Sequence, residues 1–206
     1  MIIYLHGFAS GPGSKKAQFL HERFRSHRIE LLVPDLSEGD FENLTLTKQL
    51  RVIERLADGR PVSLIGSSMG GYLAALYAAR HREVGRLLLL APAFGLSRRW
   101  AEWLGEDQMS AWKQLGYHSF FHYGEGRERR LSYGIVEDAA HYEDFPDVTQ
   151  PVLLFHGRAD TAVPCALSEE FARWRPNVQL TLLEDGHELT GSLETIWTAA
   201  RGFFGL

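Results

Sequence analysis

The feature that most constrains the fold is a regular alternation between short apolar runs and stretches with helical periodicity. Strand-like runs cover residues 2–5, 29–33, 62–65, 87–90, 152–155 and 178–183. Helix-like stretches begin at Ser14 and then cover residues 44–57, 69–80, 166–174 and 193–204. Strands that are apolar throughout and alternate with helices predict an α/β fold. We expect a mostly parallel sheet of about six strands, with helices on both faces.

Residues 95–150 interrupt this alternation. The segment shows no strong strand and is too long for a plain crossover. It is rich in aromatic residues, namely Trp100, Trp103, Trp112, Tyr117, Phe120, Phe121 and Tyr123. We expect a small helical lid inserted in a single domain of residues 1–206. Trp100, Trp103 and Trp112 are predicted to bind substrate, although aromatic rings that only pack the lid onto the body explain the composition equally well.

The size and composition narrow the class of protein. The 206 residues fit one domain, and 45% hydrophobic with 23% charged residues is ordinary for a globular protein. The net charge of -4 predicts no basic surface for nucleic acid or anionic membranes. The single cysteine, Cys165, excludes an intramolecular disulfide, and the N-terminus lacks a basic leader. We expect a cytoplasmic protein without a membrane segment; the oligomeric state stays open.

A G-x-S-x-G pattern occurs where the third apolar run meets a helix. Gly66-Ser67-Ser68-Met69-Gly70 follows residues 62–65 and opens an alanine-rich stretch. This context is typical of a nucleophile elbow, whose central serine occupies a sharp, strained turn. Glycines two residues to either side let the strand and the helix approach. The spacing selects Ser68 rather than Ser67. A tight glycine-rich turn is the alternative. A Walker loop is excluded, because no Lys-Ser/Thr pair follows the glycines.

A serine nucleophile requires a base, and the base requires an acid that orients it. Enzymes with this elbow place the three in the chain order Ser, Asp or Glu, His. Asp160 follows the fifth apolar run within HGRAD, and His187 follows the sixth within DGH. Because the carboxyl ends of parallel strands meet at one edge of a sheet, we predict that Ser68, Asp160 and His187 form a catalytic triad.

Simpler roles exist for the acid and the base. Asp160 could cap the helix that begins near Pro164, and His187 could be a turn residue after Gly186. Neither role explains why both residues follow strands. Asp185 also follows a strand and is expected to hold the turn. The lid residues Glu137 and Asp138 are weaker candidates for the acid.

The chain has nine histidines, so position decides their roles. His6 and His156 each precede a glycine at a strand end, and we expect structural hydrogen bonds from them. No spacing of histidine, cysteine and aspartate suggests a zinc site, and no cofactor is expected.

Attack on a carbonyl creates an oxyanion that needs positioned donors. One donor would be the backbone N–H of Met69, which follows the nucleophile. The other would be the N–H of Phe8 in the His6-Gly7-Phe8 turn after the first strand. The side chain of Phe8 would then line the acyl site. An ordinary strand-to-helix turn is the alternative.

The segments YLHGF, GSSMGG, HGRAD and DGHE, in that order, resemble the α/β-hydrolase superfamily along nearly the whole chain. Within it, the loop HGF-x-S-x-P-G-S-K and GSSMGG are similar to the small bacterial YqiA-type esterases. Residues 123–142 look more like the mitochondrial acyl-glucuronide esterase and palmitoyl-protein thioesterase. The chain departs from larger members because it starts at the strand before the oxyanion loop, so their first two strands are expected to be missing.

The resemblance implies a serine hydrolase that cleaves a carboxylic ester or thioester through an acyl-enzyme at Ser68. Two other functions stay open. The same triad could cleave a peptide or a carbon–carbon bond, or the fold could serve a non-catalytic binding protein. The expected partner is a small-molecule ester or thioester.

Overall fold

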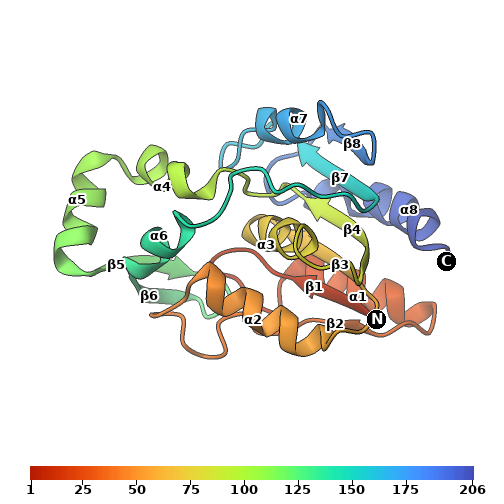
Figure 1. The fold of residues 1–206 in the computed structure, drawn as a ribbon, viewed down its shortest axis with the longest axis horizontal. Helices are drawn as coiled ribbons and strands as arrows, with labels where there is room; N and C mark the ends of the chain where they lie inside the picture. Colours follow the sequence, from red (N-terminus) through yellow and green to blue (C-terminus); the bar gives the residue numbers. More distant parts are fainter.

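A parallel six-stranded sheet lies at the centre of the computed structural model, which describes residues 1–206 (Figure 1). Its strands are β1 (Ile2–Leu5), β2 (Leu31–Leu32), β3 (Val62–Ser67), β4 (Val84–Leu90), β7 (Val152–Gly157) and β8 (Val178–Leu183). They are ordered β2-β1-β3-β4-β7-β8, and every neighbouring pair is parallel. The predicted parallel sheet is confirmed. β2 is shorter than predicted, and β3, β4 and β7 are longer.

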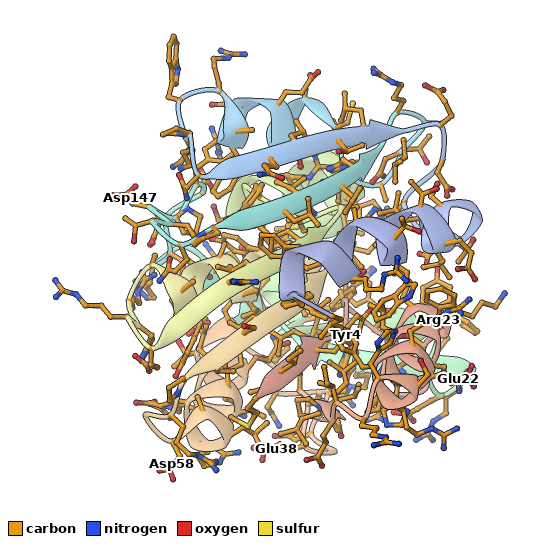
Figure 2. The ribbon with its side chains drawn as sticks, turned by 90° about the vertical axis from the view of Figure 1, so that its right-hand side faces the viewer. Tyr4, Glu22, Arg23, Glu38, Asp58 and Asp147 are labelled. Carbon is orange, nitrogen blue, oxygen red and sulfur yellow. The ribbon has the colours of Figure 1, made fainter.

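Helices cover both faces of the sheet, as predicted. α1 (Lys15–Ser26) and α8 (Leu193–Phe204) pack over one face. α2 (Leu46–Ala57), α3 (Met69–Ala78) and α7 (Ala166–Ala172) lie over the other. Successive residues of β1 alternate between the two hydrophobic cores, because strand side chains point to opposite faces. Ile3 and Leu5 join the core under α2 and α3, whereas Tyr4 lies beneath α1 and α8 (Figure 2).

Local sequence accounts for where the helices begin. Ser14 caps α1, since its hydroxyl oxygen accepts a hydrogen bond from the N–H of Ala17. Thr45 caps α2 in the same way through the N–H of Lys48 at 3.0 Å. α3 is buried along its whole length, and its small residues let it lie close to the strands. None of the helices combines the length and the apolar character needed to cross a lipid bilayer.

The insertion, residues 95–150, was predicted to be helical, and that prediction is wrong in part. It contains α4 (Leu96–Leu104), α5 (Glu106–Leu115) and α6 (Gly134–Ala139), but also an antiparallel hairpin of β5 (Tyr117–His122) and β6 (Arg127–Ser132). The hairpin has one buried side: Phe120, His122 and Leu131 are buried, while Phe121 is half exposed. The many polar residues of β6 hid this alternation. Figure 1 shows α4, α5, α6 and the hairpin of β5 and β6 beyond the carboxyl ends of the strands, away from both termini.

Candidate active site

Ser68 occupies the sharp turn between β3 and α3. Its backbone has φ of 54° and ψ of -121°, a conformation that a residue with a side chain rarely adopts. Such strain costs on the order of 1–3 kcal/mol and persists where the surroundings fix it. Here the N–H of Ser68 donates to the carbonyl of Leu90 at 2.9 Å, and its carbonyl accepts from the N–H of Ala93 at 3.0 Å. The end of β4 therefore holds the turn.

The two glycines of the pattern are required by close contacts. A Cβ atom at Gly66 would lie 2.3 Å from the carbonyl oxygen of Gly70. One at Gly70 would lie 2.1 Å from the carbonyl oxygen of Leu5 in β1. Both contacts are with backbone, which cannot move aside as a flexible side chain can. The spacing that selected Ser68 in the sequence thus has a direct steric cause.

The structure brings Ser68, His187 and Asp160 together from three loops at the carboxyl edge of the sheet. Nε2 of His187 lies 3.0 Å from the hydroxyl oxygen of Ser68. Nδ1 of His187 lies 2.7 Å from Oδ2 of Asp160. Because a carboxylate only accepts, the Nδ1–H of His187 donates to Asp160, and Nε2 accepts the proton of Ser68. The side chain of His187 is 20% exposed and that of Asp160 is fully buried.

Asp160 is held ionised by a dense set of donors. Oδ1 accepts from the backbone N–H groups of Ala162 at 2.9 Å and Val163 at 2.7 Å. Oδ2 accepts from His187 and from His156. Burial alone would raise the pKa of this carboxyl, but the hydrogen bonds from His156, His187 and Val163 hold the pKa well below its usual range. The carboxylate therefore stays charged, which is what the predicted role of Asp160 as an orienting acid requires.

His156, at the end of β7, is a buried second partner of Asp160 that sequence reasoning did not assign to the site. Its Nε2 lies 3.0 Å from Oδ2 of Asp160 and 2.8 Å from the carbonyl of Val163, so this nitrogen carries the proton. Its Nδ1 then accepts from the hydroxyl of Ser168 at 2.7 Å. The expectation of structural hydrogen bonds from His156 is met; the only signal of its role was the four-residue spacing within HGRAD.

The other carboxylates lie in different roles. Asp185 accepts from the N–H of Gly186 at 2.8 Å and from the hydroxyl of Ser192 at 2.9 Å, so it holds the turn before His187. Asp138 accepts from the N–H of Thr47 at 2.9 Å and thereby joins α6 to α2. Neither forms a hydrogen bond with His187. No group of three or more His, Cys, Asp or Glu side chains is arranged to hold a metal ion.

The turn after β1 lies directly against Ser68. A Cβ atom at Gly7 would lie 3.3 Å from the Cβ of Ser68. The N–H of Phe8 donates to no acceptor within the chain. The N–H of Met69 belongs to the first residue of α3 and so has no partner in the helix. Two backbone donors in the segments that adjoin Ser68 are thus without a partner in the chain. His6 braces the turn, because its Nε2 accepts from the N–H of Leu36.

Aromatic rings from the insertion surround Phe8. Its ring centroid lies 5.4 Å from Trp100, 6.2 Å from Trp103 and 5.2 Å from Phe120. Phe41, which sequence reasoning missed, lies 5.6 Å away. Trp103 is 60% exposed, but Trp100 is 2% exposed and Trp112 is fully buried. The indole N–H of Trp112 donates to the carbonyl of Leu131. Trp100 and Trp112 therefore pack the insertion, which corrects their predicted contact with substrate.

Comparison with known proteins places the chain in a family. The sequence model of "Uncharacterised protein family (UPF0227)" matches residues 1–203. The chain belongs to this family. Its UPF0227 membership agrees with the resemblance to YqiA-type proteins that the sequence predicted.

Solved structures share the fold of this UPF0227 chain. Mouse alpha/beta hydrolase domain-containing protein 10 is 24% identical, with a TM-score of 0.82 over 99% of this chain and 89% of its own. Est1E from Butyrivibrio proteoclasticus, solved with ferulic acid bound, is 24% identical, with a TM-score of 0.81 over 98% and 87%. A putative hydrolase from Agrobacterium vitis S4 is 24% identical, with a TM-score of 0.83 over 98% and 86%. The α/β-hydrolase fold is confirmed.

Proposed function

We propose that the chain is a serine hydrolase that cleaves a carboxylic ester or thioester. The observation that carries this proposal is the continuous hydrogen-bonded line from Asp160 through His187 to Ser68, at 2.7 and 3.0 Å. A serine hydroxyl becomes a useful nucleophile only when a base accepts its proton, and this geometry supplies the base and the acid that orients it.

The reaction would proceed in two halves. Nε2 of His187 takes the proton of Ser68 while Oγ attacks the carbonyl carbon, and the N–H groups of Phe8 and Met69 stabilise the oxyanion. The imidazolium then gives that proton to the departing alcohol or thiol, which leaves an acyl group on Ser68. In the second half, water loses a proton to His187 and attacks the acyl-enzyme. The bond between the acyl carbon and Oγ then breaks, the His187 imidazolium returns the proton to Oγ of Ser68, and the carboxylic acid departs.

The acyl group would lie against Phe8 and Trp103, under the insertion acting as a lid. Phe8 carries one oxyanion donor, so its side chain adjoins the reacting carbonyl, and Trp103 presents an exposed ring beside it. The structure of Est1E contains ferulic acid, an aromatic acid, which makes aromatic acyl groups reasonable probes of this wall.

A substrate panel tests the proposed reaction class. We expect turnover of p-nitrophenyl acetate and butyrate and of an S-acyl thioester. A p-nitroanilide of the same acyl group should react at least about 100-fold more slowly, because an amine leaves less readily than a phenol or a thiol. Initial rates with all four compounds check this. An anilide that reacts as fast as the ester would favour a peptidase instead.

Trp103→Ala should weaken binding of an aromatic acyl ester without slowing the chemical step. Losing one aromatic contact typically costs about 0.5–1.5 kcal/mol, so KM for p-nitrophenyl cinnamate should rise roughly 2- to 12-fold with kcat little changed. Trp174→Ala is the matched control. Trp174 is 84% exposed and comes just before β8 begins, so it lies at the amino ends of the strands, away from Ser68. Equal effects of the two substitutions would contradict an acyl site at Trp103.

A further inference from the structure

Lys16, in the first turn of α1, is a buried cation that the proposed mechanism does not use. Its side chain is 7% exposed, whereas the adjacent Lys15 is exposed. Nζ donates to the backbone carbonyl of Glu188 at 2.9 Å and approaches Oε2 of Glu188 at 3.3 Å. An ammonium group is removed from water at a high cost unless it is paired and hydrogen-bonded. A buried lysine with such fixed partners is therefore a specific contact, not a solvated surface group.

The contact with Lys16 fixes Glu188, the residue that follows the proposed base His187. The carboxylate of Glu188 is 74% exposed, so its ion pair with Lys16 is screened by water and contributes little. The backbone carbonyl is the more constrained partner. On its other side, Leu189 is fully buried in the core under α1 and α8 and has a left-handed φ of 52°. The peptide between Glu188 and Leu189, one residue beyond His187, is thus fixed by Lys16 and by the burial of Leu189.

The charges around Lys16 belong to the same site. Burial lowers the pKa of Lys16, while the carboxylates of Glu188, Asp160 and Asp185 oppose that shift. The ammonium therefore lies in the field of the acid that orients His187 and of the aspartate that holds the turn before it.

Lys16 also connects two parts of the site that are far apart in sequence. α1 begins directly after the loop that carries Phe8, and Glu188 lies 172 residues further along the chain. We propose that Lys16 is a positioning residue, which sets the place of the His187 imidazole relative to Ser68 and the oxyanion loop through the Glu188 carbonyl. This inference rests on the proposed function.

Lys16→Met tests the inference, because methionine fills a similar volume without a donor. We expect kcat for p-nitrophenyl butyrate to fall roughly 10- to 100-fold, since a misplacement of about 1 Å at a catalytic group can cost that much. KM should stay within about two-fold of wild type, because Phe8 and Trp103, which would contact the acyl group, are unchanged. A fluorophosphonate should label Lys16→Met more slowly than the wild type, and the rate constant for labelling should fall by the same factor as kcat.

Two matched controls separate positioning from packing and from the surface ion pair. Lys15→Met changes the exposed neighbour on the same helix, and Glu188→Gln removes the carboxylate while keeping the carbonyl. Both should retain kcat within about two-fold of wild type. A Glu188→Gln variant that loses as much kcat as Lys16→Met would overturn the proposal that Lys16 acts through the backbone carbonyl of Glu188.

A Lys16→Met protein with a lowered melting temperature but wild-type kcat would show a packing role and sink the inference. If that variant does not fold, Lys16→Leu, which also lacks a donor, replaces it under the same criteria. A wild-type protein that neither turns over any ester nor reacts with the fluorophosphonate would instead refute the proposed function. The two failures are therefore distinguishable.

Discussion

Ser68→Ala should lower kcat for a p-nitrophenyl ester on the order of 10⁶-fold, the loss expected when a serine nucleophile is removed from its triad. The hydroxyl that Nε2 of His187 faces at 3.0 Å would be gone, so no acyl-enzyme could form. The fold should persist, because alanine and serine have the same restrictions at a φ of 54°. Initial rates and thermal unfolding, measured on the same preparation, check both halves of the expectation.

Ser67→Ala is the matched control for that experiment. Ser67 is the adjacent residue and is 3% exposed, but no hydrogen bond joins it to His187. Its substitution should leave kcat within about ten-fold of wild type, as for a change that does not touch the reacting atoms. If Ser68→Ala kept wild-type turnover, or if Ser67→Ala lost as much, the nucleophile would be assigned wrongly.

Asp160→Asn should lower kcat on the order of 10⁴-fold, as expected when the orienting acid of a triad becomes an amide. The new side chain has only one acceptor oxygen, and the backbone N–H groups of Ala162 and Val163 claim it. Its NH₂ group would then face Nδ1 of His187. That nitrogen must accept, which moves the imidazole proton to Nε2, where it blocks uptake of the Ser68 proton. Steady-state kinetics at neutral pH measure the loss.

Asp185→Asn provides the comparison for the acid. Asp185 is also a carboxylate after a strand, only two residues from His187, but it bonds Gly186 and Ser192. Its substitution should cost less than about ten-fold in kcat, since it alters a turn and not the line of proton transfer. An Asp185→Asn enzyme more impaired than Asp160→Asn would reverse the assignment of the acid.

Much of the fold was predictable because the strands are buried on both faces. β1 and β8 have the bounds expected from their apolar runs, and α8 matches its helical pattern. Ser68 could be placed because its elbow needs glycines at fixed positions, and the structure shows backbone contacts that require them. Asp160 and His187 could be paired because both follow strands whose ends must meet at one edge.

The unpredicted features depend on contacts between distant segments. The hairpin of β5 and β6 is covered on one side only, and charged residues on its outer side obscure the pattern. Trp112 and Trp103 look alike in the sequence, but only the packing of α5 against β5 and β6 buries the first. Lys16 follows another lysine, and nothing local shows that one of the two is buried against Glu188.

Covalent labelling reports directly whether one serine of the chain is activated by its neighbours. The intact wild-type protein would be treated with a fluorophosphonate and examined by mass spectrometry, with fragmentation to locate the adduct. We expect one phosphonyl group per chain, on Ser68, and greatly slowed labelling in Asp160→Asn. A folded protein that gains no adduct, or gains it at another serine, would contradict an activated nucleophile at this site.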